Sequence, residues 1–169
     1  YMGGKYFLAK DIVQIMKSHV DPNDVDGYLE PFCGACSVLT KMNEHYKCIA
    51  SDYHPDLIQL WKDVQSNVFK EPTYMDEDTY NDIKKYKSPS AIKAFVGFGC
   101  SFGGKYFAGY ADKYKNNKKE NYLQEISNSI RKKKDKLNGI EFHCCSYDAW
   151  KPSKMLIYCD PPYQTTKYP

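Results

Sequence analysis

The sequence lacks a membrane-spanning run, because no stretch approaches the roughly 18 apolar residues that such a helix requires. Its start also lacks the charged segment and apolar stretch of a secretory signal. With 42% hydrophobic and 27% charged residues, the composition is typical of a soluble globular protein and excludes collagen-like, coiled-coil and wholly disordered chains. We expect one cytoplasmic domain, or a piece of one, because a typical domain has roughly 100 to 200 residues.

The number and spacing of the cysteines also favour neither a disulfide framework nor a structural zinc site. The seven cysteines are an odd number in a chain large enough to need no cross-links. Cys48, Cys144 and Cys159 lie in or beside apolar stretches, so we expect buried thiols and a reducing compartment. Cys33 and Cys36 form one CxxC pair, but a structural zinc site needs a second ligand pair. We therefore expect no metal.

Arginine is scarce, since Arg131 is the single arginine among 24 Lys and Arg residues. The net charge is only +3, but residues 113–136 hold nine basic and three acidic side chains, a local balance of +6. Such a stripe indicates either a polyanionic partner or a solvated helix face, and charge alone leaves both open. Lysine suits phosphate contacts as a point charge, whereas paired hydrogen bonds to guanine favour arginine.

Hydrophobic periodicity indicates α/β structure at both ends of the chain. Short apolar runs at 25–29 and 48–50 predict buried strands, and the pattern beginning at Pro55 predicts a helix, since proline suits a first helical turn. Strand character returns at 140–145 and 155–159. The order strand, glycine turn, helix, strand is typical of a doubly wound α/β sheet.

The middle of the chain has mostly helical spacing. Within it lies a stretch rich in glycine and aromatic residues, 96–110, which we expect to be a loop with functional demands or a poorly ordered insertion. We therefore divide the chain into a first α/β segment, 1–65, a helical insertion, 66–138, and a closing segment, 139–169.

A glycine turn after the first predicted strand is the first candidate site. Gly34 lets a ligand approach the backbone, and a following helix offers free N–H groups. Asp52 ends the next strand 18 residues later, where doubly wound folds place the acid that binds ribose hydroxyls. The pair favours a nucleoside-bearing cofactor, although a tight turn and a helix cap explain the same residues. The turn lacks the phosphate-loop motif and the full dinucleotide fingerprint.

The DPPY motif, residues 160–163, is the second candidate site because it follows the last predicted strand. Its prolines fix the backbone and remove two N–H donors, which leaves carbonyl groups to face a ligand. Asp160 and the Pro161 carbonyl can both accept hydrogen bonds from one amino group, and Tyr163 can stack on a flat ring. The motif indicates a clamp for an exocyclic amine on a planar heterocycle; a proline-rich turn under a tyrosine lid is the plainer alternative.

Four motifs together make the chain resemble the Dam-type DNA adenine-N6 methyltransferases, which use S-adenosylmethionine. They are YMGGK at 1–5, EPFCGA at 30–35, SDYHPDLI at 51–58 and DPPY at 160–163, in the family's order. The resemblance implies a Rossmann-like methyltransferase sheet with a mostly helical DNA-recognition insertion. It implies methyl transfer to the N6 amine of an adenine flipped out of the duplex. It also implies that the family's later strands, and so the C-terminal part of the sheet, are missing from this chain.

The resemblance assigns roles to individual residues. Catalysis falls to Asp160, Pro161, Pro162 and Tyr163, and cofactor binding to Tyr1, Lys5, Phe32, Gly34, Asp52 and Asp160. In these roles Tyr1 packs near the methionine end of the cofactor, Lys5 meets its carboxylate, and Asp52 holds its ribose. Tyr147 and Asp148 lie where relatives carry an acid followed by an aromatic residue near the cofactor adenine.

The same resemblance makes double-stranded DNA the partner of the insertion. The lysines expected to contact phosphates are Lys113, Lys115, Lys118, Lys119, Lys132, Lys133 and Lys134. Phe98, Phe102, Tyr106 and Phe107 can either insert between bases or pack in a small core. A cognate restriction endonuclease is a further partner. Two alternatives stay open, namely a methyltransferase acting on RNA or a protein amide, and a non-catalytic remnant that binds nucleic acid.

Overall fold

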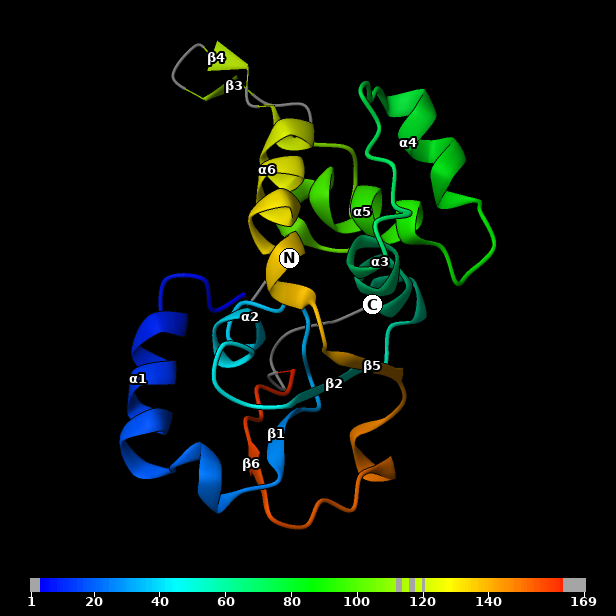
Figure 1. Ribbon diagram of the computed structural model, residues 1–169. Coiled ribbons are helices and arrows are strands. Elements are labelled where there is room, and N and C mark those ends of the chain that lie inside the picture. The colour runs from blue at the N-terminus through cyan, green and yellow to red at the C-terminus, as the bar shows by residue number, and fades with distance from the viewer. Residues whose placement is uncertain (1–3, 112–113, 116–117, 120, 163–169) are drawn as a thin grey trace.

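The computed structural model describes residues 4–111, 114–115, 118–119 and 121–162 of the 169-residue chain (Figure 1). At its centre four parallel strands form a sheet in the order β5-β2-β1-β6. The strands are β1 (Gly27–Glu30), β2 (Cys48–Asp52), β5 (Glu141–Cys144) and β6 (Met155–Ile157). They lie at the four apolar runs that predicted strands, and the α/β class is confirmed.

The pairing of β1 explains its sequence signal. Tyr28 lies opposite Cys48 of β2 and Leu156 of β6, so β1 has a neighbour on each side, and all four of its residues are buried. A strand buried on both faces appears in the sequence as a continuous apolar run rather than as an alternation.

The helices of the first segment flank the sheet. α1 (Ala9–His19) lies next to α2 (Leu39–Met42) on one side of the sheet, and α3 (Pro55–Gln65) follows β2 (Figure 1). α3 begins at Pro55, as predicted, because the His54 ring caps it: Nδ1 accepts a hydrogen bond from the Leu57 N–H at 3.4 Å. The described 3-10 helices are η1 (Pro22–Asp24), η2 (Phe102–Gly104), η3 (Asp135–Leu137) and η4 (Tyr147–Ala149). None of the described helices is long and apolar enough to cross a membrane.

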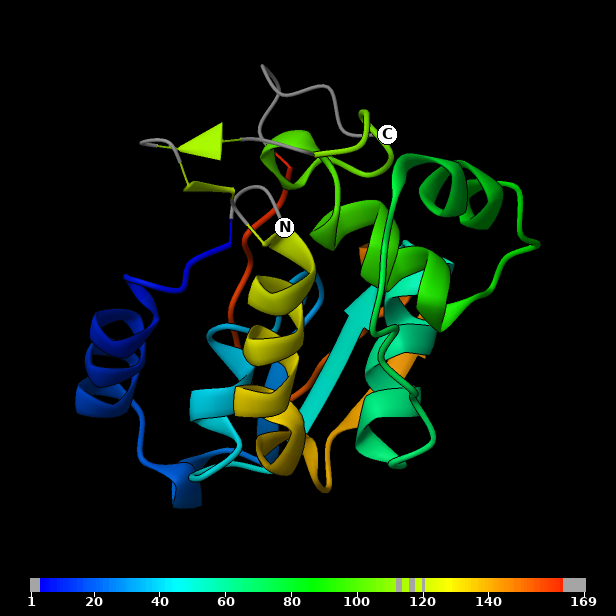
Figure 2. The same cartoon turned by 90° about the horizontal axis from the view of Figure 1, so that it is seen from above.

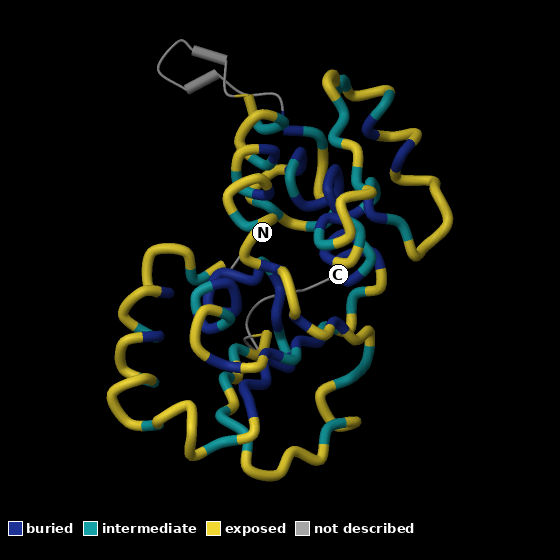
Figure 3. The backbone as a smooth tube through the Cα atoms, in the orientation of Figure 1, coloured by how far each residue is buried: buried dark blue, intermediate teal, exposed yellow. Residues whose placement is uncertain are grey.

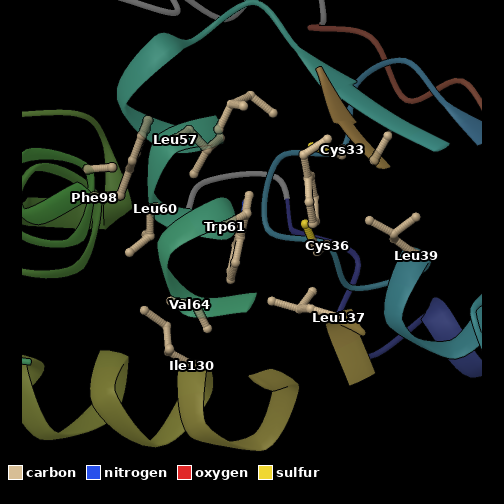
Figure 4. Close-up of a cluster of buried hydrophobic side chains, with 14 of the residues drawn as sticks. Cys33, Cys36, Leu39, Leu57, Leu60, Trp61, Val64, Phe98, Ile130 and Leu137 are labelled. Atoms are coloured by element: carbon tan, nitrogen blue, oxygen red, sulfur yellow. The ribbon is translucent and has the colours of Figure 1, made fainter. Parts of the chain in front are cut away.

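The middle segment is mostly helical and shares its core with the sheet. It contains α4 (Glu77–Lys84), α5 (Ala91–Gly99), α6 (Tyr122–Lys134) and an antiparallel hairpin of β3 (Tyr114–Lys115) and β4 (Lys118–Lys119) (Figure 2). One cluster of buried side chains joins Trp61 of α3, Phe98 of α5 and Ile130 of α6 (Figure 4). Figure 3 shows buried backbone positions both in the sheet and in these helices. The insertion is therefore packed onto the sheet's own helix.

The stretch 96–110 is only partly the loop that the sequence predicted: residues 96–99 belong to α5, whereas 100–110 consist of turns and the short helix η2. Its first residues continue α5, and the Phe107 N–H donates to the Gly97 carbonyl at 2.9 Å. A methyl group added at Gly97 would lie 2.6 Å from the rings of Tyr106 and Phe107, and one at Gly99 would lie 2.6 Å from Ile126. These glycines permit close packing against α5, which sequence alone does not distinguish from loop flexibility.

The aromatic residues of this stretch mostly face the core. Phe98 and Phe107 are each only 9% exposed, and the Tyr106 ring lies 4.8 Å from each of theirs. Only Phe102 of the four predicted wedges is exposed. The sequence left open whether these rings insert between bases or pack in a core, and the structure shows core packing for Phe98, Tyr106 and Phe107.

A buried carboxylate fastens the insertion to α3. Asp56 accepts hydrogen bonds from Ser88 Oγ at 2.9 Å, from the Ser90 N–H at 2.7 Å and from the Tyr106 hydroxyl. Burial, followed by this bond to Asp56, raises the pKa of Tyr106. Since Asp56 follows the end of β2 closely, the contact fixes the insertion relative to the edge of the sheet where the strands end.

The cysteines are only partly as predicted. All seven are free, and Cys48 is buried, as are Cys33 and Cys36. Cys144 and Cys159 are exposed, so the prediction of buried thiols was wrong for both. Both lie at the ends of β5 and β6, the edge strands of the described sheet, where fewer neighbours cover the side chains.

Candidate active site

The two predicted sites meet at the carboxyl ends of β1 and β6. β6 pairs with β1 on the side opposite β2, so the direction of chain order in the sheet reverses between them. Open parallel sheets bind ligands outside their carboxyl ends at such a reversal. The glycine turn, residues 33–36, follows β1, and Asp160 follows β6. This edge is therefore the natural position for a ligand.

Lys5 and Asp160 form an ion pair at this edge. Lys5 Nζ lies 2.8 Å from Asp160 Oδ1 and 2.6 Å from Oδ2, and each side chain is only 20% exposed. Two charge-assisted hydrogen bonds in a partly buried setting hold a carboxylate in one orientation. The fold thus joins the GGK and DPPY motifs, whose paired residues are 155 positions apart.

Asp52 and Gly34 are also brought together. The Gly34 N–H donates to Asp52 Oδ2 and the His54 N–H donates to Asp52 Oδ1, each at 3.0 Å. Burial raises the pKa of Asp52, and these backbone hydrogen bonds oppose that rise. Each carboxylate oxygen keeps capacity for a second hydrogen bond. Asp52 therefore fixes the turn and still offers acceptors to a ligand.

The turn has an unusual backbone. Gly34 has φ 43° and Cys36 has φ 55°, and the left-handed region costs a residue with a Cβ about 1–2 kcal/mol. Cys36 carries a Cβ in this conformation, which glycine would adopt freely, so the chain accepts strain at this position. Its side chain is fully buried. Such strain persists only where the surroundings fix the conformation.

An aromatic pair lies beside the turn. The rings of Phe32 and Tyr147 are 5.4 Å apart with an interplanar angle of 34°, and Tyr147 is 62% exposed. The segment that carries Tyr147 is anchored to β2, because Trp150 Nε1 donates to Ser51 Oγ at 2.8 Å. The structure thus places Tyr147 next to a predicted cofactor residue, where both rings offer apolar surface to a planar group.

Glu30 is a site residue for which the sequence gave no role. It ends β1, is only 3% exposed, and accepts a hydrogen bond from the Tyr28 hydroxyl at 2.8 Å. Burial raises the pKa of Glu30 to about 8; the bond from Tyr28 acts against this, while the charge of Asp160 adds to it. The signal that could have found Glu30 is an acid ending a buried strand.

The predicted DNA-contacting lysines separate into groups. Lys132 and Lys134 are exposed on α6, and the backbones of Lys115, Lys118 and Lys119 form the β3–β4 hairpin. Lys133 instead points into the protein, where its Nζ donates to the Ala35 carbonyl at 2.7 Å. Consecutive helical residues project about 100° apart, so a run of lysines cannot all face one partner.

Several predicted residues remain at the margin of the site. Pro161 and Pro162 are exposed, and Asp148 lies in η4 with Tyr147. Tyr1, Tyr163 and Lys113 lie outside the described residues. Within the described ranges no group of three His, Cys, Asp or Glu side chains is suited to a metal ion.

Glu30 predicts a pH dependence of stability. Between the pKa near 4.3 of an exposed glutamate and its folded pKa of about 8, only the folded chain retains the proton. The free energy of unfolding therefore falls as pH rises through this range, by up to roughly 1.4 kcal/mol per pH unit. Denaturant titrations from pH 5 to 8 should show this fall relative to Glu30→Gln, with the exposed Glu125→Gln as control. Parallel curves for wild type and Glu30→Gln would contradict the assignment.

Comparison with known proteins identifies the family to which this geometry belongs. No curated protein matches the chain significantly. Residues 1–95 and 99–169 match the family described as D12 class N6 adenine-specific DNA methyltransferase. The match covers most of the chain and includes every motif discussed above. The chain belongs to the D12 class of N6 adenine-specific DNA methyltransferases, enzymes that methylate the N6 amine of adenine in DNA.

Proposed function

We propose that the edge formed by β1, β2 and β6 binds both S-adenosylmethionine and the target adenine, and that Asp160 acts on the adenine amine. The observation that carries this proposal is the convergence of two pairs, Lys5 with Asp160 and Gly34 with Asp52, at the ends of adjacent strands. A methyl donor and an acceptor amine must lie within reach of each other, and this convergence supplies that proximity.

The residues at the turn fit the proposed cofactor. Asp52 offers buried carboxylate oxygens to the ribose hydroxyls, and Gly34 presents no side chain there. Phe32 and Tyr147 offer ring faces to the adenine, and Tyr1 belongs with the methionine end. When bound, S-adenosylmethionine supplies the methyl group as a sulfonium. Because Lys5 pairs with Asp160, we assign Lys5 to holding that carboxylate, in place of the cofactor contact expected from the sequence.

The proposed chemistry at Asp160 follows from the amine. The N6 lone pair of adenine is delocalised into the ring and is a poor nucleophile. Hydrogen bonds from its two N–H groups to Asp160 and the Pro161 carbonyl draw the nitrogen toward tetrahedral geometry and free the lone pair. These contacts strengthen as the methyl group is transferred, so they lower the barrier. The ion pair with Lys5 keeps Asp160 oriented for this task.

We further propose that the adenine is flipped out of the duplex, since its N6 atom cannot be reached within the base stack. Pro162 stiffens the segment, and Tyr163 stacks on the extruded base. The exposed Lys132 and Lys134 of α6, together with the lysines of the β3–β4 hairpin and Lys113, contact phosphates of double-stranded DNA.

The strand order supports a Rossmann-like reading of the sheet. The order β5-β2-β1-β6 corresponds to the first four strands, 3-2-1-4, of the doubly wound fold. We propose that the complete sheet continues beyond β6 with the family's later strands. The DNA substrate and the seven free cysteines support a cytoplasmic location. A cognate restriction endonuclease is a further proposed partner, and it rests on the family resemblance alone.

Cofactor binding is tested by calorimetric titration of S-adenosylmethionine into the chain, with ATP and NAD as controls. Wild type should bind S-adenosylmethionine selectively. Asp52→Ala should weaken this binding at least roughly tenfold, since a buried hydrogen-bonding carboxylate is lost. The exposed Asp24→Ala should bind like wild type. A folded wild type that does not bind, or an Asp52→Ala variant with unchanged affinity, would refute the proposed cofactor site.

Methyl transfer is tested with Asp160→Ala. Incorporation of labelled methyl groups into DNA that lacks N6-methyladenine should fall at least roughly a hundredfold, the effect of removing one preorganised transition-state contact. Circular dichroism should confirm that the fold is retained, and Asp24→Ala serves again as the matched control. Turnover near the wild-type rate in a folded Asp160→Ala protein would remove Asp160 from the mechanism.

DNA contact by α6 is tested through its salt dependence. Replacing Lys132 and Lys134 by methionine should weaken duplex binding and make the plot of log affinity against log salt shallower by about 0.9 per lost phosphate contact. Fluorescence anisotropy at several salt concentrations measures both quantities. Lys10→Met, on the exposed side of α1, is the control. An unchanged slope in the double variant would exclude α6 from the DNA interface.

A further inference from the structure

The glycine turn, residues 33–36, is held from outside by side chains of three different elements. Asp52, at the end of β2, accepts from the Gly34 N–H at 3.0 Å. Trp61 of α3 donates its indole N–H to the Gly34 carbonyl at 2.8 Å. Lys133 of α6 donates to the Ala35 carbonyl at 2.7 Å. Asp52 and Trp61 belong to the first segment of the chain, whereas Lys133 belongs to the insertion.

Lys133 differs from its neighbours in the lysine run. Lys132 and Lys134 are exposed, whereas Lys133 is half-buried, and its ammonium lies 5.6 Å from the centre of the Trp61 ring. Burial lowers the pKa of Lys133. A lysine that gives up hydration needs compensating partners, and here these are one carbonyl of the turn and the face of one indole. Figure 4 shows Trp61 between α3 and the turn that carries Cys33 and Cys36.

The two carbonyl contacts fix the peptide groups on either side of Ala35. Because a trans peptide is planar, its N–H points opposite to its C=O. Trp61 thus sets the direction of the Ala35 N–H, and Lys133 sets that of the Cys36 N–H, which donates to the Cys33 carbonyl at 2.7 Å.

We infer that Lys133 is a positioning residue of the cofactor turn, which fixes the Ala35–Cys36 peptide from α6 and so maintains the left-handed conformation of Cys36. Its relevance to the cofactor rests on the proposed function, but its effect on the turn does not. Cys36 stands at a strained φ of 55°, and strain of this kind persists only when contacts over-determine the backbone. Lys133 supplies one such contact, and its role differs from the phosphate contact that its place in the lysine run predicted.

The test compares Lys133→Met with Lys134→Met in the unliganded chain. Methionine keeps the apolar stem of lysine and removes the ammonium. Amide hydrogen exchange of residues 33–37 should become roughly tenfold faster in Lys133→Met, because one charge-assisted hydrogen bond is lost. Exchange in β2 should not change, and Lys134→Met should leave the turn as protected as in wild type. Lys133→Arg, which retains a cationic donor, should restore protection.

Two results would overturn the inference. Unchanged exchange at the turn in Lys133→Met shows that Lys133 does not hold it, and equal acceleration in Lys134→Met shows only a general loss of stability in α6. If Lys133→Met does not fold, Lys133→Gln is measured against the same expectation, since the shorter amide group also lacks the ammonium.

Calorimetry then connects the turn to the cofactor. Lys133→Met should weaken S-adenosylmethionine binding roughly tenfold while the salt dependence of DNA binding stays as in wild type. Lys134→Met should leave S-adenosylmethionine binding as in wild type and make the salt dependence of DNA binding shallower. Unchanged S-adenosylmethionine affinity in Lys133→Met would overturn the cofactor role of Lys133. Failure of the wild type to bind S-adenosylmethionine would refute the proposed cofactor site, whereas the exchange experiment would still decide the role of Lys133 at the turn.

Discussion

The parallel pairing of β6 with β1 is the constraint on which the rest of the site depends. Parallel strands end at the same edge of a sheet, so this pairing brings the DPPY motif to the turn that follows β1. The same edge receives Asp52 from β2, and Lys5 reaches it from the start of the chain. The pairing of these short strands thus brings motifs that are far apart in the sequence to the same edge of the sheet.

Burial at that edge explains the electrostatics of its carboxylates. Asp160 is paired with a lysine, Asp52 is hydrogen-bonded to backbone N–H groups, and Glu30 is bonded to a tyrosine hydroxyl in the core. Burial is the main cause of the raised pKa of Glu30, and the negative charge of Asp160 adds to it.

The helical insertion is tied to this edge by direct contacts. Asp56 binds residues of the insertion just beyond β2, and Lys133 binds the turn after β1 from α6. Trp61 and Ile130 belong to one core that runs from α3 to α6 (Figure 4). The helical insertion is therefore packed on α3, the same helix whose Trp61 holds the glycine turn.

The sequence by itself determined the strands, the start of α3 and the family, because apolar runs, a proline and ordered motifs are local signals. Only the tertiary structure decided that Phe98 and Phe107 are packed in the core and that Cys144 and Cys159 are exposed. It also decided that burial raises the pKa of Glu30 and that Lys133 faces the turn. These depend on which surfaces cover a residue, and a residue's neighbours in sequence do not specify its neighbours in space. Residues alike in sequence, such as Lys132, Lys133 and Lys134, thus acquire different surroundings because a helix turns each toward a different side.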